Sequence, residues 1–315
     1  MSWTTVAERG SVLGMRITIW VFRLFGPRVS AWFVVPIVGY FFVSDARGRR
    51  ASRRYLARVY AAPGGAAALG HPPGARDSFR HYRQFALTIL DRVAFALGRG
   101  HHFDIALQGS EHIDDVLASG RGAVLVGAHL GNFDALRALA HRSGVVVNVA
   151  MFTRHAARIN RLLRELDPTI DVRVLHLDPA APDLALRLRA CIDRGEFVAI
   201  LGDRVGQGAR ARVVRVPFFG VDAPFPQGPF LLAGVLACPV LLIVGLRGGP
   251  ARYDVFVEPL AGAVPIAPRL RTERIRDLVA TYARRLEAFC LRAPYQWFNF
   301  YDFWGDETHA PEPTR

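Results

Sequence analysis

Two side chains that can transfer protons lie five positions apart, directly after an apolar run. Residues 123–126 read Ala-Val-Leu-Val, and the following Gly-Ala-His-Leu-Gly-Asn-Phe-Asp contains His129 and Asp134. The run is typical of a buried strand, Gly131 allows a turn, and Asn132 can cap a helix that carries Asp134. A carboxylate on one ring nitrogen orients a histidine and leaves the other nitrogen free to accept a proton. The pattern predicts that His129 is a general base and that Asp134 holds its ring; a hydrogen-bonded core histidine is the alternative.

This motif is the first of five that follow in order along the chain. It resembles the HX4D/E signature of the lysophospholipid acyltransferase superfamily, and its Gly-Asn-Phe filling is most similar to the lipid A biosynthesis acyltransferase branch. That branch commonly carries Glu where this chain has Asp134. The resemblance covers about residues 15–304. The other motifs are Phe152-Thr-Arg154 with Asn160, Gly202-Asp203-Arg204, Val216-Pro-Phe-Phe-Gly220 with residues 223–230, and the aromatic segment 294–304.

The resemblance implies transfer of a fatty acyl group from a thioester to a hydroxyl or amine of a lipid or glycolipid. His129 would remove the acceptor proton during direct attack on the thioester, while backbone N–H groups of Gly131 and Asn132 stabilise the oxyanion. The thioester is a co-substrate, so no metal or redox cofactor is expected. Four side chains are expected to bind substrate: Asn132, Arg154, Asp203 and Arg204.

Three further features have a functional and a structural interpretation. Arg204, oriented by Asp203, could clamp a phosphate, or the pair could brace the turn. The carboxyl-terminal aromatic segment could lie beside the active site or close the core. An acyl pocket needs apolar walls, but buried aromatic rings are usually core. The pocket candidates are Phe218, Phe219 and Phe225.

The first sixty residues combine apolar runs with arginines. Residues 12–25 are apolar except for two arginines, residues 29–43 carry no charge, and residues 45–54 contain five arginines. Neither run reaches the roughly twenty residues that span a bilayer comfortably. We expect a helical hairpin in one leaflet of the inner membrane, with arginines at anionic headgroups on the cytoplasmic face. Two buried helices and one tilted span are the alternatives.

The net charge of the chain is +13, and all 40 basic residues are arginine. The chain shows no helix-turn-helix, zinc-finger or aromatic RNA-binding signature, so we expect no nucleic acid partner. A basic surface favours an acidic acyl carrier protein over coenzyme A as the donor. The three cysteines are widely spaced among apolar residues, which indicates core packing rather than a disulfide framework or a zinc site.

Strand and helix patterns alternate along the rest of the chain. The alternation predicts an α/β fold with a mostly parallel central sheet flanked by helices, and a site beyond the carboxyl ends of the strands. The predicted strands are 105–107, 123–126, 145–150, 172–177, 197–201, 213–216, 240–246 and 253–257, and the predicted helices are 114–118, 132–142, 155–166, 182–193, a buried one before Pro239, and 271–291.

We therefore expect a membrane-associating helical segment over residues 1–60, an acyltransferase domain over residues 61–304 and a polar tail over residues 305–315. Two other functions stay open on the same scaffold. One is an aminoacyl or other thioester-to-lipid transferase, which would need a short polar donor pocket. The other is a lipid-binding protein without catalysis, because a scaffold does not guarantee chemistry.

Overall fold

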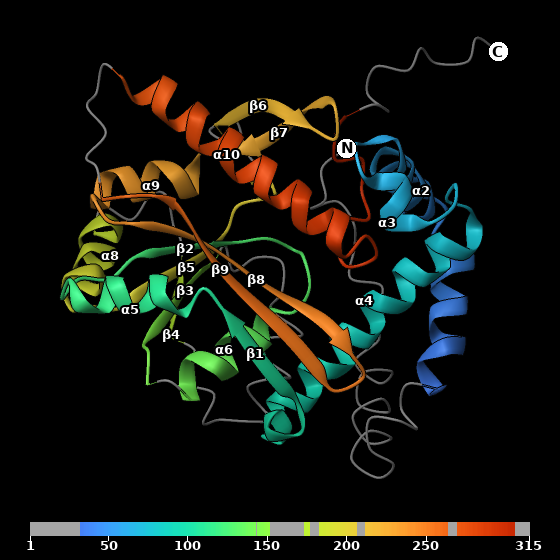
Figure 1. Cartoon of the computed structure of the whole chain (residues 1–315), viewed down its shortest axis with the longest axis horizontal. Helices are drawn as coiled ribbons and strands as arrows, with labels where there is room; N and C mark the ends of the chain where they lie inside the picture. Colours follow the sequence, from blue (N-terminus) through green and yellow to red (C-terminus); the bar gives the residue numbers. More distant parts are fainter. Residues whose placement is uncertain are drawn as a thin grey trace.

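A seven-stranded sheet forms the centre of the molecule (Figure 1). The computed structural model describes residues 32–142, 144–151, 173–176, 183–206, 212–263 and 270–305. The strand order is β1-β9-β8-β2-β5-β3-β4, and every neighbouring pair is parallel except β8 with β9. A separate antiparallel pair is formed by β6 and β7. The predicted α/β fold with a mostly parallel central sheet is confirmed.

The elements follow the predicted alternation. The strands are β1 Asp104–Gln108, β2 Val124–Gly127, β3 Val147–Met151, β4 Arg173–His176, β5 Phe197–Leu201, β6 Val213–Phe218, β7 Val221–Pro226, β8 Val240–Gly249 and β9 Arg252–Ala261. The helices are α2 Ala46–Ala61, α3 Gly65–Leu69, α4 Ala75–Ala96, the 3-10 helix η2 Arg99–His102, α5 Ser110–Ala118, α6 Phe133–Arg142, α8 Leu184–Asp193, α9 Gly228–Leu236 and α10 Arg271–Arg292. Residues 32–44 are also helical.

Each predicted strand has a counterpart in the structure, but several elements were not predicted, α3 and η2 among them. Another is β7, whose prolines suggested turns; in a two-stranded pair a proline costs little because one side of each strand needs no partner. A further one is α4. The predicted helix 155–166 lies outside the described residues.

Strand side chains alternate between two hydrophobic cores, as the period of two requires. In β2, Val124 and Val126 belong to the core that also contains residues of α8, α9 and α10. Leu125 belongs to the core on the opposite face, with residues of α5 and α6. The sheet is therefore covered by helices on both faces. A ligand-binding site is then expected beyond the carboxyl ends of the strands.

The helix α2 packs on the main core although the sequence analysis assigned it to the membrane-associating segment. Its Tyr55, Leu56 and Val59 are at most 1% exposed and share that core with α10. The segment over residues 1–31 lies outside the described residues. Among the helices that the structure describes, none is long and apolar enough to cross a bilayer. All three cysteines are free and buried, as predicted for core packing.

A buried histidine ties the amino-terminal helices to the carboxyl-terminal segment. His81 on α4 is fully buried, and its Nε2 lies 2.8 Å from the carbonyl oxygen of Trp297. Nε2 therefore donates, and Nδ1 accepts from the Ser52 hydroxyl on α2 at 3.0 Å. Burial lowers the pKa of His81 from 6.5 to about 4, against the opposing effect of the Trp297 hydrogen bond. The ring is neutral in the folded protein.

This network predicts a specific pH dependence of stability. The unfolded chain binds more protons than the folded one between pH 6.5 and about 4, so the free energy of unfolding should fall as the pH falls through that window. The full loss is about 3 kcal/mol on the usual conversion of pKa to free energy. We expect His81→Gln, which keeps an amide donor, to be less stable at pH 7 but to lose less between pH 7 and 5. Denaturant unfolding at both pH values measures this, and equal losses in the two proteins would contradict it.

Candidate active site

The site forms where two neighbouring strands end together. β2 and β5 are parallel, with Gly127 opposite Leu201. The pairing continues past the strands, because the Gly202 N–H donates to the Gly127 carbonyl at 2.9 Å. A side chain at residue 202 would lie 2.7 Å from Val126 Cγ1, so only glycine fits this approach. Two residues beyond each strand, this register brings His129 and Asp203 side by side.

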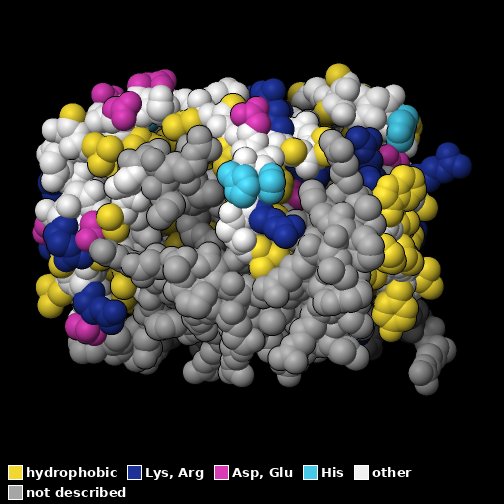
Figure 2. Space-filling model, turned by 90° about the horizontal axis from the view of Figure 1, so that it is seen from below, with side chains coloured by type: hydrophobic (Ala, Val, Ile, Leu, Met, Phe, Trp, Pro, Cys, Tyr) yellow, Lys and Arg dark blue, Asp and Glu magenta, His cyan; other side chains and the backbone are white. Residues whose placement is uncertain are grey.

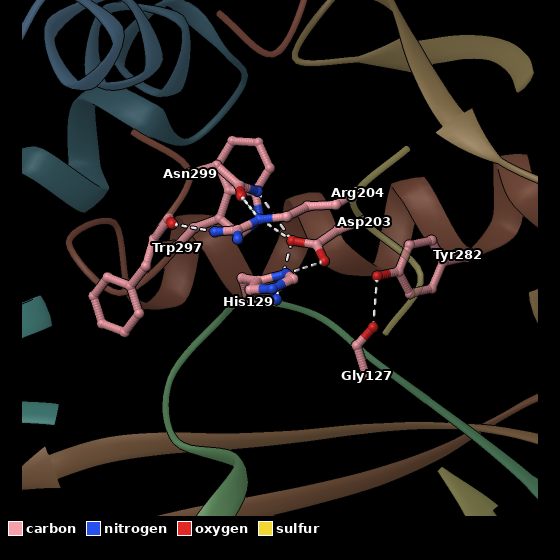
Figure 3. Close-up of polar contacts among 8 residues, drawn as sticks. Gly127, His129, Asp203, Arg204, Tyr282, Trp297 and Asn299 are labelled. Atoms are coloured by element: carbon pink, nitrogen blue, oxygen red, sulfur yellow. Dashed lines mark hydrogen bonds and ion pairs between the residues drawn. The ribbon is translucent and has the colours of Figure 1, made fainter. Parts of the chain in front are cut away.

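His129 and Asp203 make a two-point contact (Figure 3). The ring Nδ1 lies 2.7 Å from Asp203 Oδ1, and the backbone N–H of His129 donates to Oδ2 at 3.0 Å. The Asp203 side chain is fully buried, whereas that of His129 is 28% exposed. Because Nδ1 donates to the carboxylate, Nε2 keeps its lone pair and can accept a proton.

Asp203 is held ionised by donors from several parts of the chain. Trp297 Nε1 and Asn299 Nδ2 each donate to Oδ2 at 3.0 Å. Burial raises the pKa of the Asp203 carboxyl, but the nearby His129, its hydrogen bonds and the charge of Arg204 outweigh burial and hold that pKa well below its usual range. A permanent negative charge therefore faces the ring.

The ring itself is unprotonated at neutral pH. Burial and the charge of Arg204 lower the pKa of His129 below 6.5, and Arg92 acts in the same direction. Asp203 raises this pKa but does not cancel the other effects. A neutral ring with an oriented Nδ1–H is the state that a general base requires.

The structure corrects the predicted role of Asp134. Its Oδ2 accepts a hydrogen bond from Arg92 Nε on α4 at 2.6 Å, whereas the carboxylate on the Nδ1 of His129 is Asp203. Asp134 lies in the first turn of α6 and faces α4, while the register of β2 and β5 decides which carboxylate meets the ring. Spacing along the chain suggested the wrong partner.

The predicted oxyanion donors are also corrected. The Gly131 N–H donates to the Gln296 carbonyl at 2.9 Å, and the Asn132 N–H donates to the Gly245 carbonyl at 2.8 Å. Gly131 has φ +69°, and a Cβ there would overlap the Gly245 carbonyl. Both N–H groups are therefore engaged within the protein.

Asn132 caps α6 as predicted. Its Oδ1 accepts from the Asp134 N–H at 2.9 Å, and its Nδ2 donates to the Tyr253 hydroxyl at 3.1 Å. The residue is 1% exposed. Both ends of its amide are used to position α6, so these contacts support a structural role for Asn132.

Arg204 braces the carboxyl-terminal segment. Its Nε donates to Asn299 Oδ1 at 2.6 Å, and its Nη2 donates to the Phe298 carbonyl at 2.8 Å. Asn299 therefore bridges Arg204 and Asp203 (Figure 3). These contacts support the structural alternative over a phosphate clamp. Arg154 and Asn160 lie outside the described residues.

The aromatic residues predicted for an acyl pocket are part of the core. Phe218, Phe219 and Phe225 are at most 6% exposed. The ring of Phe218 lies 5.3 Å from that of Trp297, and the ring of Phe225 lies 5.5 Å from that of Phe303. These three residues therefore pack in the hydrophobic core and do not line a pocket, which agrees with the alternative interpretation from the sequence.

An apolar cavity lies on the other face of the sheet. Its volume is about 230 Å³, and it is lined by residues of the sheet, α5 and α6. Phe133 and Leu136 of α6, Leu125 of β2, Ala199 of β5 and Ile243 of β8 are among its lining residues. Phe133, the first residue of α6, stands four positions after His129 in the chain.

Three residues of the site were not predicted individually. Trp297 and Asn299 belong to the aromatic segment that the sequence analysis placed beside the active site or in the core, and Trp297 does both. Arg92 gave no signal, because α4 itself was not predicted. A basic residue within a helix is ordinarily a solvated surface residue.

The geometry places a partly exposed histidine against a buried carboxylate, beyond the ends of two neighbouring strands of an α/β fold. A model of the bacterial lipid A biosynthesis acyltransferase family matches residues 17–305, and the chain therefore belongs to this family. The protein is an acyltransferase, and the family acts on a lipid acceptor with an acyl donor. No curated protein matches the chain.

The His129–Asp203 pair predicts the effect of one conservative change. Asp203→Asn removes the charge that stabilises the protonated ring of His129. The asparagine amide also no longer keeps the ring proton on Nδ1, so we expect kcat to fall by about 10²- to 10⁴-fold. Asp222→Asn, which alters an exposed carboxylate on β7, is the matched control and should retain full activity. The initial rate of acyl transfer measures both. An Asp203→Asn enzyme with the wild-type kcat would contradict the assignment.

Proposed function

We propose that the protein transfers a fatty acyl group from a thioester donor to a hydroxyl or amine of a lipid or glycolipid. The observation that carries the proposal is the 2.7 Å contact between Nδ1 of His129 and a buried carboxylate, with the ring partly exposed. This arrangement suits a base that deprotonates the acceptor as it attacks. Membership of the family supports an acyl donor and a lipid acceptor.

In the proposed mechanism the acceptor attacks the thioester carbonyl directly. Its proton moves to Nε2 of His129, and Asp203 stabilises the imidazolium that forms. When the tetrahedral intermediate collapses, the carbon–sulfur bond breaks and the sulfur takes the proton from Nε2. Such a base accelerates the reaction by roughly 10²- to 10⁴-fold.

The state of the cysteines supports direct transfer over a covalent intermediate. All three are buried, and burial raises the pKa of each thiol, that of Cys238 to about 11. The thiolate is the nucleophilic form, so these groups are poor acyl carriers at neutral pH. The thioester supplies the acyl group and the chain moves only a proton, so the proposed route uses no metal or redox cofactor.

We further propose that the acyl chain enters the cavity under α6. A dry cavity of about 150 Å³ accommodates benzene, so a volume of about 230 Å³ corresponds to roughly nine chain carbons on the same scale. Its lining is almost wholly apolar, with Ser110 and Asp114 as the polar members. An apolar cavity favours a fatty acyl group over an aminoacyl group, which would need polar partners.

A membrane surface as partner is supported by one face of the 32–44 helix. Large hydrophobic side chains are exposed there: Trp32, Phe33, Ile37, Tyr40 and Val43, between 43% and 79%. Figure 2 shows hydrophobic side chains gathered at one edge of the molecule. Exposed aromatic rings next to basic residues suit an interface with anionic lipid. The neighbouring α2 exposes Arg47, Arg50 and Arg53.

This surface leads to a proposed location and donor. We place the protein at the cytoplasmic face of the inner membrane, where a thioester donor and a lipid acceptor are both available. An acidic acyl carrier protein is the donor that the net charge of +13 favours over coenzyme A.

Lipid mass spectrometry of expressing cells tests the function. Wild-type protein should add the mass of one acyl group to a lipid, and His129→Ala, expressed and folded equally, should abolish the addition. Ala199→Leu, which fills part of the cavity, should shift the added group to a shorter chain. No lipid mass change with wild type, or the same change with His129→Ala, would contradict the proposal and favour a lipid-binding protein without catalysis.

Vesicle flotation tests the membrane surface. We expect Trp32→Ser/Phe33→Ser/Tyr40→Ser to reduce binding to vesicles that contain anionic lipid by several-fold, because burial of aromatic surface drives interfacial binding. The matched control is Leu117→Ser/Leu186→Ser/Val235→Ser, which removes exposed hydrophobic side chains from α5, α8 and α9. Equal flotation of the two variants would count against the 32–44 helix as the docking face.

A further inference from the structure

Helix α4 holds the beginning of α6 at two adjacent residues. Asp91 accepts hydrogen bonds from the Tyr253 hydroxyl at 2.6 Å and from Arg247 Nε at 2.7 Å, and Tyr253 in turn accepts from Asn132. The next residue, Arg92, donates from Nε to Asp134 at 2.6 Å. Asn132 and Asp134 flank the helix start, so both contacts fix Arg92 relative to the His129 motif.

The guanidinium of Arg92 uses only its Nε–H group in the contact with Asp134. The Asp134 carboxylate is 6% exposed, but the Arg92 side chain is 31% exposed. The contact with Asp134 uses Nε, and in the described part of the chain neither terminal nitrogen of Arg92 has a hydrogen-bond partner. An arginine held by a buried carboxylate on one edge presents its other N–H groups in a fixed direction.

Several other donors near His129 are engaged within the described part of the chain. The N–H groups of Gly131, Asn132 and Asp134 all donate to acceptors within the protein. Arg204 is bound to the carboxyl-terminal segment. Acyl transfer from a thioester places negative charge on the carbonyl oxygen, and that charge needs a preorganised donor or cation.

We propose that Arg92 is a catalytic residue that stabilises this oxyanion, and that Asp134 is the positioning residue that orients Arg92. The inference rests on the proposed acyl transfer. The acceptor atom bonds to the thioester carbon while its proton passes to Nε2 of His129, and the carbonyl electron pair moves onto the oxygen facing Arg92. The pair then returns, the carbon–sulfur bond breaks, and the sulfur receives the proton from Nε2.

The electrostatics of the site support this placement. The charge of Arg92 is close enough to His129 to lower the pKa of the ring. The same charge lies at the amino-terminal end of α6, where the helix dipole already favours negative charge. In this chain the carboxylate of the HX4D motif therefore acts on the oxyanion through an arginine, while Asp203 acts on the base.

Steady-state kinetics of the full-length protein test the proposal. Decanoyl acyl carrier protein serves as donor and a lipid extract of the expression host as acceptor. Arg92→Ala should lower kcat by about 10²- to 10³-fold with little change in KM, and Arg92→Lys should lose less. Added guanidinium should restore part of the Arg92→Ala rate. The control is Arg83→Ala, which removes an exposed arginine about two and a half turns earlier on α4 and should keep the wild-type kcat.

Two readouts separate this role from a structural one. Without Arg92 the pKa of His129 should rise, so the acidic limb of the pH–rate profile should move to higher pH. Asp134→Asn should slow the wild type but cause no further loss in Arg92→Ala, since it acts through the arginine. Additive losses of the two changes, or an unmoved acidic limb, would overturn the proposal.

A donor without a phosphate separates an oxyanion contact from a phosphate contact. Decanoyl-N-acetylcysteamine carries the same thioester but lacks the phosphodiester of phosphopantetheine. The loss in Arg92→Ala should persist with this donor, and its disappearance would make Arg92 a phosphate ligand. A wild type that transfers nothing contradicts the proposed function. A wild type that transfers, with His129→Ala inactive and Arg92→Ala at full kcat, contradicts the role of Arg92 alone.

Discussion

The Asp203 carboxylate is a buried negative charge, and the surrounding structure is arranged to satisfy it. A buried carboxylate is costly unless donors surround it. Here the backbone and ring of His129 follow β2, Asp203 itself follows β5, and the Trp297 and Asn299 donors come from the carboxyl-terminal segment. The register of two strands and the docking of a distant segment therefore meet in one group, and a shift in either would leave the charge without its donors.

Asp203 also affects the pKa of His129, the residue that we propose as the base. A catalytic histidine must be unprotonated before reaction and must tolerate a proton during it. Burial, Arg204 and Arg92 keep the pKa of His129 below its usual value, while Asp203 opposes them. The two arginines thus favour the neutral ring, and the Asp203 carboxylate stabilises the ring once it is protonated. Each arginine is tied to a fixed partner, Asn299 for Arg204 and Asp134 for Arg92, so these charges need no rearrangement during reaction.

Patterns along the chain predicted the architecture well, because the periodicity of strands and helices and their alternation along the chain are mostly local signals. They also placed His129 and Asp203 at the same edge of the sheet. They failed for α4, whose buried face mixes polar with apolar residues. Leu87, Leu90 and Phe95 are buried there together with polar residues: Asp77, Ser78, His81, Thr88 and Asp91. Polar residues on the buried face interrupt the hydrophobic periodicity by which a helix is recognised.

The partner of His129 was mispredicted for a related reason. Spacing along the chain favours Asp134, but the contact at Nδ1 depends on the register of β2 against β5, across 74 residues. The aromatic residues Phe218, Phe219 and Phe225 have the composition of either a pocket or a core, and only packing decides between them. The apolar cavity has no signature of its own, since it consists of space between ordinary core residues.

Nitrogen NMR of the His129 ring tests the central claim most directly. In protein labelled at its ten histidines, the spectrum of His129→Gln assigns the ring signals of His129. At pH 7 we expect a neutral ring that carries its proton on Nδ1, and Asp203→Asn should abolish this preference while Asp134→Asn should leave it unchanged. A ring protonated on Nε2 at pH 7, or a tautomer that follows Asp134 instead of Asp203, would contradict the account.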